Sequence, residues 1–230
     1  ATGRTGPTQA QVNTAYDGTT LDDAVTINTQ GIQEWTVPAT ATYTIEVWGA
    51  QGGSHSTLFS GGKGARMKGD FQLDANQVLK ILVGQQGIGG NNSQSNHHSG
   101  GGGGGTFVVT SANSLLIAAG GGGGGYQYGS SISDGIDGTT ATSGTAGQDG
   151  IGGGSNGSGG NSSNGGSSAG FSGDGNNSAT SFLNGGTGGL MSTSWGDYSL
   201  HGGFGGGGGS GLPSGGGGGY SGGGGGAWNT

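Results

Sequence analysis

The chain of 230 residues has no cysteine, only three prolines and few charged residues. Without cysteine it cannot be a disulfide scaffold, and without abundant proline and a glycine at every third position it cannot be a collagen. Charged residues make up 7% of the chain, where ~25% is usual, so a charged disordered tail is also excluded. The longest apolar run, Leu115–Ala119, is far shorter than the ~20 residues of a membrane-spanning helix. We therefore expect no membrane span.

The few charges are unevenly placed, and the formal net charge is −7. Every Lys and Arg lies at or before Lys80, and because phosphate binding requires these residues, nucleic acid is not expected as a partner. The remainder of the chain is rich in Gly, Ser, Asn and Thr, a composition that favours an extracellular or cell-surface location. No signal peptide is visible at Ala1, which indicates a mature or trimmed chain.

Glycine is what the chain has in excess, with 67 residues against a usual ~7%. The longest runs are Gly100–Gly105, Gly120–Gly125, Gly205–Gly209, Gly215–Gly219 and Gly222–Gly226. Such runs are typical of flexible linkers. Here, however, they have repeated lengths and aromatic residues beside them, and two of them enclose a predicted strand pair. We therefore predict ordered glycine in the extended left-handed helix with three residues per turn, packed as polyglycine II.

A polyglycine bundle is not expected to fold by itself. Ordering each residue costs ~1–2 kcal/mol of backbone entropy, and each backbone hydrogen bond returns a net ~0.5–1.5 kcal/mol. These two contributions roughly cancel, and glycine adds almost no apolar burial. The bundle therefore needs a scaffold that fixes its ends.

Alternating apolar residues before residue 120 predict that scaffold. In Ala65–Leu73 the apolar side chains fall on every second residue, which is the pattern of a half-buried strand. Further strands are expected at Ile32–Val37, Tyr43–Trp48, Val78–Val83, Thr106–Thr110 and Leu115–Ala119. Their spacing indicates an antiparallel β-sandwich of about seven strands. The predicted core residues are Ile45, Val47, Phe71, Leu73, Ile81, Val83 and Leu116.

A short helix is predicted near the N-terminus, where Thr8 caps the first turn, Val12 and Tyr16 share one face, and Gly18 ends the helix. It is too short to be stable alone, so it must pack on another element. We expect one composite domain over residues 1–230. It comprises an N-terminal segment at 1–19, a mainly β-sandwich scaffold at 20–119 that includes the run at 100–105, and a polyglycine II bundle at 120–230.

Several motifs resemble the glycine-rich domain of the anaplastic lymphoma kinase and leukocyte tyrosine kinase receptors, and related bacterial or environmental extracellular glycine-rich proteins. They are Trp35–Gly53, Lys63–Leu73 (KGARMKGDFQL), Ile81–Gly87 (ILVGQQG), Leu116–Gly125, Gly202–Gly209 and Gly215–Tyr220. The resemblance covers about residues 30–226. It implies a tumour-necrosis-factor-like (TNF-like) β-sandwich joined to a bundle of polyglycine II helices.

The resemblance also has limits. The receptor domain binds small cytokines, but no ligand-contact motif is found in this chain, and the receptors' cysteines are missing. The receptor domain continues past its last glycine run into a closing strand, which Ala227–Thr230 does not supply. Either that strand was cut away, or another subunit donates one.

The sequence carries no recognisable catalytic, cofactor or metal motif. His97 and His98 are adjacent, so in a strand their side chains point apart instead of converging on a metal. His55 and His201 are isolated and are expected at the surface. Three aspartates, Asp134, Asp137 and Asp149, lack the ligand spacing of a calcium loop and are expected to cap turns. We therefore expect no enzyme, no cofactor and no bound metal.

Aromatic residues supply the candidate binding surface. Most of them are expected in the core or at the ends of glycine helices. Four are predicted instead at loop tips, where binding functions concentrate: Tyr126, Tyr128, Trp195 and Tyr198. The expected function is a structural or adhesive module that self-associates as a homo-oligomer or fibre and contacts a glycan or a protein ligand. Two alternatives are a cytokine-binding ectodomain module and a phage tail-fibre tip adhesin, which this chain resembles in composition.

Overall fold

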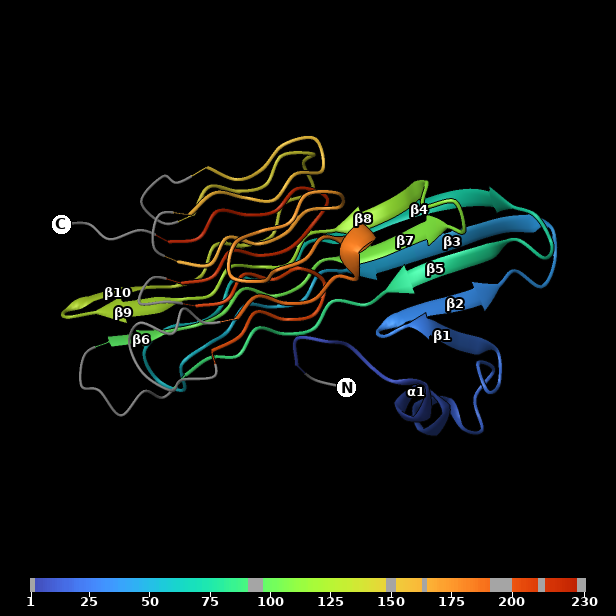
Figure 1. Cartoon of the computed structure of the whole chain (residues 1–230), viewed down its shortest axis with the longest axis horizontal. Helices are drawn as coiled ribbons and strands as arrows, with labels where there is room; N and C mark the ends of the chain where they lie inside the picture. Colours follow the sequence, from blue (N-terminus) through green and yellow to red (C-terminus); the bar gives the residue numbers. More distant parts are fainter. Residues whose placement is uncertain are drawn as a thin grey trace.

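A computed structural model describes residues 3–90, 97–147, 152–162, 165–190, 200–210 and 214–226. Most of the strands lie at one end of the molecule, and long extended segments run side by side toward a small sheet at the other end (Figure 1). Within the described ranges the strands of each sheet pair antiparallel. None of the helices in these ranges has the length and apolarity to cross a bilayer. The all-β class predicted from the sequence is confirmed.

Seven strands form two sheets at the strand-rich end. The larger sheet has the order β1-β2-β5-β7-β8, and β3 pairs with β4 in the smaller one. The bounds are β1 Val25–Thr29, β2 Ile32–Thr36, β3 Ala41–Trp48, β4 Arg66–Leu73, β5 Val78–Leu82, β7 Thr106–Thr110 and β8 Leu115–Ala119. The predicted strands therefore agree with the structure to within two residues at each end.

The core of this sandwich lies between the two sheets. Its buried residues are Val37, Val47, Leu73, Leu79, Val108, Ile117 and Ala119. Exposure alternates along β4, as its sequence predicts. Ile45, Phe71, Ile81 and Leu116 are partly buried against this core, so six of the seven predicted core residues belong to it.

The prediction for Val83 is wrong, because its side chain is 43% exposed. Val83 directly follows the last residue of β5. There the chain leaves the sheet for the glycine segments, and the smaller sheet no longer covers it. The alternating pattern was extended one residue too far.

The predicted N-terminal helix is present as α1, Gln9–Tyr16. Thr8 and Gln11 form a reciprocal capping box at its start, and Gly18 has a φ of 68° just beyond its end, a left-handed conformation that favours glycine. Val12 is the buried residue of the helix. The Tyr16 hydroxyl lies 2.6 Å from Gln33 Oε1 on β2, so α1 packs on the larger sheet, as its short length requires.

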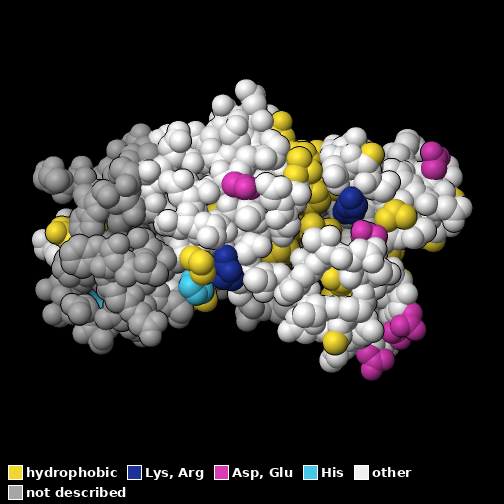
Figure 2. All heavy atoms as spheres, viewed as in Figure 1, with side chains coloured by type: hydrophobic (Ala, Val, Ile, Leu, Met, Phe, Trp, Pro, Cys, Tyr) yellow, Lys and Arg dark blue, Asp and Glu magenta, His cyan; other side chains and the backbone are white. Residues whose placement is uncertain are grey.

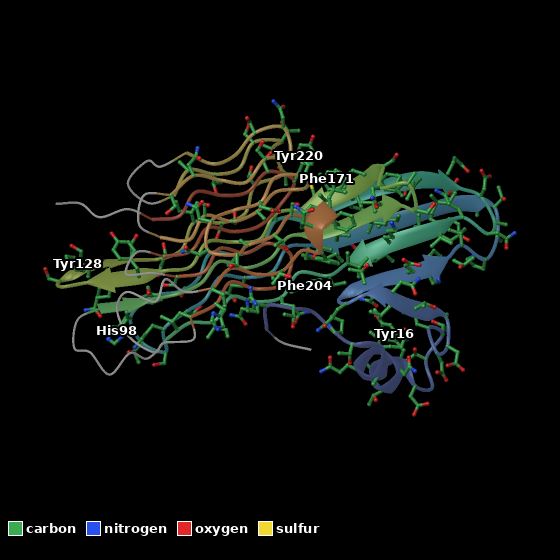
Figure 3. The ribbon with its side chains drawn as sticks, in the orientation of Figure 1. Tyr16, His98, Tyr128, Phe171, Phe204 and Tyr220 are labelled. Carbon is green, nitrogen blue, oxygen red and sulfur yellow. The ribbon has the colours of Figure 1, made fainter. Side chains whose placement is uncertain are left out.

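The other face of the larger sheet packs on the glycine segments through aromatic side chains. Its buried cluster contains Ile32, Leu82, Phe107, Val109, Phe182 and Phe204. Phe182 belongs to a short 3-10 turn, η1 Phe182–Asn184, and its ring stacks on Phe171 at 5.4 Å. Phe171 also stacks on Tyr220 at 6.3 Å, and both are labelled with Phe204 in Figure 3. Figure 2 shows hydrophobic side chains near the middle of the visible face. Aromatic residues next to the glycine runs thus join the two parts.

The run Gly100–Gly105 lies fully buried among the other extended segments. Its N–H groups return to the same neighbour at every third residue. Gly100 and Gly103 donate to segment 122–125, Gly101 and Gly104 to segment 85–88, and Gly102 and Gly105 to segment 205–208. The run therefore presents its donors in three directions with a period of three residues.

Carbonyl groups of the same run contact three more segments. Gly101 and Gly104 accept from segment 50–53, Gly100 and Gly103 accept from segment 215–218, and Gly102 accepts from Gly203. Six segments thus surround this run. The run 222–226 repeats the pattern, because Gly222 and Gly225 donate to segment 158–161, and Gly223 and Gly226 to segment 214–217. We call these hydrogen-bonded segments the glycine bundle.

Side chains do not fit inside the glycine bundle. A Cβ on Gly105 would lie 2.8 Å from Gly219 Cα, and a Cβ on Gly102 would overlap the carbonyl oxygen of Gly216. These obstacles are backbone atoms, which cannot rotate away. Glycine in the run is therefore required by the close approach of neighbouring backbones.

Candidate binding surface

A small sheet lies at the end of the glycine bundle, far from the sandwich (Figure 1). It contains β6 His97–Ser99, β9 Tyr126–Tyr128 and β10 Ser131–Ser133 in the order β10-β9-β6. β9 begins where the run Gly120–Gly125 ends, so side chains first become possible at Tyr126. The turn to β10 passes through Gly129, whose φ is 58°. We call this element the distal sheet.

Two of the predicted binding residues share one face of the distal sheet. Tyr126 and Tyr128 are two residues apart on β9, so their side chains leave the same face, with Cα atoms about 7 Å apart. Tyr128 is 43% exposed, and its position at the tip is labelled in Figure 3. Paired tyrosines on a flat backbone present apolar rings and hydroxyl groups together, which suits contact with a glycan or a protein.

The opposite face of the distal sheet is supported by the loop 54–60. His98 lies opposite Gln127 in the β6–β9 register, and its ring centroid is 4.7 Å from that of His55. The His55 ring also contacts Phe59 at 5.7 Å between centroids, and Phe59 is 4% exposed. The prediction of His55 as an isolated surface residue is therefore wrong, because it packs in an aromatic contact that sequence spacing does not reveal.

No group of three potential metal ligands converges among the described residues. His55 Nδ1 accepts a hydrogen bond from Thr57 N at 3.2 Å. The Nδ1 atom of His55 is therefore occupied by a backbone donor. The contact of the His55 and His98 rings is therefore a packing contact.

Two of the three predicted turn-capping aspartates fix the loop beneath the distal sheet. Asp134 Oδ1 accepts from Ser60 N, and Asp137 Oδ1 accepts from Lys63 N, each at 2.7 Å. Both carboxylates cap backbone donors of a segment distant in sequence. Asp149 lies outside the described residues, as do Ala227–Thr230 and the other two predicted binding residues, Trp195 and Tyr198.

His201 differs from its predicted surface position. It is partly buried, and its Nδ1 is buried without a hydrogen-bond partner among the described residues. Burial, and secondly the positive charge of Arg4, lower the pKa of His201 below its usual 6.5. The fold therefore disfavours the charged form of this side chain.

This shift predicts a loss of stability in mild acid. The folded state binds the His201 proton less readily than the unfolded state. The free energy of unfolding therefore has its full value above the unfolded pKa near 6.5. It decreases as the pH falls below that value, until the folded imidazole is itself protonated. Thermal melts at about pH 7.5 and about pH 5 should show that His201→Asn loses less stability on acidification than the parent chain. An equal loss in both proteins would contradict the prediction.

Comparison with known proteins gives a partial similarity to a receptor. No protein-family model matches the chain. A stretch of 92 residues is 39% identical to the leukocyte tyrosine kinase receptor of Mus musculus. The match covers 38% of this chain and 10% of the receptor, so the chain spans about a tenth of the length of that relative. The similarity suggests this receptor family for part of the chain, and it fits the predicted extracellular location.

Proposed function

We propose that the chain is a non-enzymatic extracellular structural and adhesive module, built from a TNF-like β-sandwich and a bundle of polyglycine II helices. The observation that carries the proposal is the run Gly100–Gly105, whose six N–H groups and five of whose C=O groups bond to six surrounding segments. A return to each neighbour at every third residue is what three residues per turn require. Such a bundle acts as a stiff body that holds its two ends at a fixed separation.

The two ends of this body differ in their chemistry. The sandwich has an apolar core that anchors the bundle, and the distal sheet presents Tyr126 and Tyr128 at the other end. Between them, the surface of the second half of the chain is almost uncharged. A polar, almost uncharged surface of backbone hydrogen-bonding groups suits contact between copies, so we infer a self-associating building block of a surface or fibre, with adhesion at the distal sheet.

Removing the two tyrosines tests the adhesive part of the proposal. The double variant Tyr126→Ala, Tyr128→Ala should lose about tenfold or more of the binding to a glycan array or a glycoprotein-coated surface. Its mass by light scattering should stay equal to that of the parent chain. Trp48→Ala is the matched control, because Trp48 is an exposed aromatic residue (54%) on β3 of the sandwich.

The same two measurements can reject the proposal. A parent chain that stays a monodisperse monomer at high concentration contradicts self-association. A parent chain that binds no glycan or glycoprotein, or a double variant that binds as well as Trp48→Ala, contradicts adhesion through the distal sheet.

A second candidate function is a ligand-binding ectodomain module. The similarity to the leukocyte tyrosine kinase receptor favours it, because the matched stretch belongs to a receptor. In that case the chain should capture one small protein in a stoichiometric complex and should not form filaments under negative-stain microscopy.

A further inference from the structure

A second concave surface lies on the larger sheet, apart from the distal sheet. It is a cleft of about 120 Å³ on the face that also carries the Phe107 and Phe182 cluster. Its lining residues are Thr29, Ile32, Glu34, Lys80, Asn113, Phe182, Leu183 and Gly185. The volume equals about four water molecules at ~30 Å³ each, so the cleft suits a small molecule and is far too small for a drug-sized ligand.

Opposite charges face this cleft without pairing. Glu34 on β2 and Lys80 on β5 are direct cross-strand partners, a placement in which opposite charges usually interact. Instead, Glu34 Oε2 accepts from Asn28 Nδ2 at 2.8 Å, and Lys80 Nζ donates to Asn113 Oδ1 at 3.0 Å. Asn28 lies on β1, and Asn113 lies in the turn between β7 and β8. The carboxylate and the ammonium are therefore held by amides on opposite sides of the cleft.

Each charged group keeps hydrogen-bonding capacity. The second carboxylate oxygen of Glu34 can accept a hydrogen bond. The Lys80 ammonium has two further N–H donors, and the Asn113 amide nitrogen adds two more beside it. One side of the cleft thus accepts hydrogen bonds from a cation, and the other side donates hydrogen bonds to an anion.

Besides Thr29 and Gly185, the remaining lining of the cleft consists of three apolar residues, Ile32, Phe182 and Leu183. Ile32 and Phe182 are buried, and Leu183 forms a rim that is 46% exposed. The turn that carries Phe182 and Leu183 is fixed by Asp174, which accepts from Ser181 N at 2.7 Å and from Asn184 Nδ2 at 3.0 Å. Burial alone would raise the pKa of Asp174, but these hydrogen bonds outweigh it and lower the pKa. The apolar wall is therefore held in place independently of Glu34 and Lys80.

We propose that this cleft binds a small apolar α-amino acid in its zwitterionic form. The ligand's ammonium group bonds to Glu34, and its carboxylate bonds to Lys80 and the Asn113 amide. Its side chain packs against Ile32, Phe182 and Leu183. A small amino acid carries both charges on neighbouring atoms, so it can reach Glu34 and Lys80 together. Its side chain can then contact the apolar lining residues. The inference is independent of the adhesive function proposed above.

An NMR titration of the full chain with L-alanine and L-valine tests the proposal. Chemical-shift changes should be confined to residues 29–34, 80–82, 113 and 182–185. N-acetylvaline lacks the ammonium group and valinamide lacks the carboxylate, so each should bind at least about tenfold more weakly, which corresponds to about 1.4 kcal/mol. Glu34→Gln and Lys80→Met should each weaken L-valine binding by a similar factor.

A matched pair elsewhere in the sandwich provides the control. Glu46 and Lys68 are also direct cross-strand partners, on β3 and β4, so Glu46→Gln and Lys68→Met make the same chemical changes away from the cleft. These variants should bind L-valine like the parent chain. Absence of localised shifts, binding of either blocked analogue as tight as that of L-valine, or equal weakening by the control variants would overturn the proposal. Tighter binding of a neutral monosaccharide than of L-valine would also overturn it.

Discussion

Replacing Gly104 with alanine should lower the stability of the chain by about 3 kcal/mol or more, the upper range for overpacking a closely packed interior. Gly104 lies in the middle of the six surrounding segments, where its N–H bonds to Gln85 O at 3.0 Å and its C=O accepts from Ala50 N at 2.9 Å. A Cβ there would overlap the carbonyl group of Phe204 and lie 2.9 Å from Gly205 Cα. Relief would require moving a backbone segment and breaking its hydrogen bonds. For a chain of this size, the melting temperature should fall by about 6–12 °C.

Gly152→Ala is the control for this substitution. A Cβ on Gly152 meets no atom within 4 Å, and its φ is not positive. Its effect should stay within about 0.5 kcal/mol. The comparison isolates close backbone packing, because both variants make the same change to the unfolded chain. Equal melting temperatures for the two variants would show that the segments around Gly104 are not closely packed.

Replacing Phe204 with alanine should lower the stability by about 3–5 kcal/mol, as for other fully buried phenylalanines. Its side chain has 0% exposure, and a Cβ on either Gly6 or Gly31 would overlap its ring. Phe204 N donates to Gly3 O at 3.1 Å, and Phe204 O accepts from Gln85 N at 2.8 Å. The residue thus joins the N-terminal segment, the β1–β2 turn and the glycine bundle. Calorimetry should show the melting temperature falling by about 6–20 °C.

Leu183→Ala provides the control, since Leu183 lies beside the same cluster but is 46% exposed. Its cost should stay below about 1 kcal/mol. If Phe204→Ala melts at the same temperature as Leu183→Ala, then Phe204 does not join the sandwich to the bundle.

Strands with an alternating side-chain pattern could be predicted from the sequence. β4 and the pair β7 and β8 match their predicted positions because apolar side chains on every second residue determine both the face and the register. α1 was predicted from its capping residue and the glycine that follows it. The failure at Val83 has the same origin, since the pattern does not show where the covering sheet ends.

The arrangement of the glycine segments could not be predicted in the same way. Every glycine in a run is chemically equivalent to the next, so nothing in Gly100–Gly105 specifies which six segments surround it. Two segments of the bundle, 50–53 and 85–88, come from within the predicted scaffold. The positions of the two runs around β7 and β8 are fixed by those strands, which begin at Thr106 and end at Ala119. The side chains of β7 and β8 thus determine the positions of the two glycine runs that flank them.

The candidate binding sites show a similar division. Tyr126 and Tyr128 were predicted at loop tips, but they lie on strand β9, a strand of three residues that is too short to show an alternating pattern. Their role in binding stays a prediction. The cleft between Glu34 and Lys80 was missed, because these residues are 46 positions apart (80 minus 34) and only the pairing of β2 with β5 brings them together. The contact of His55 with His98 was missed for the same reason.

Amide hydrogen exchange of Gly100–Gly105, followed by NMR at single-residue resolution, tests most directly whether the glycine segments form an ordered bundle. All six N–H groups donate to backbone carbonyls of neighbouring segments. They should therefore exchange as slowly as the amides of β5 and β7, through global unfolding. Exchange of these glycines at the rate of an unstructured chain, while β5 and β7 remain protected, would contradict the account and leave the runs as flexible tethers.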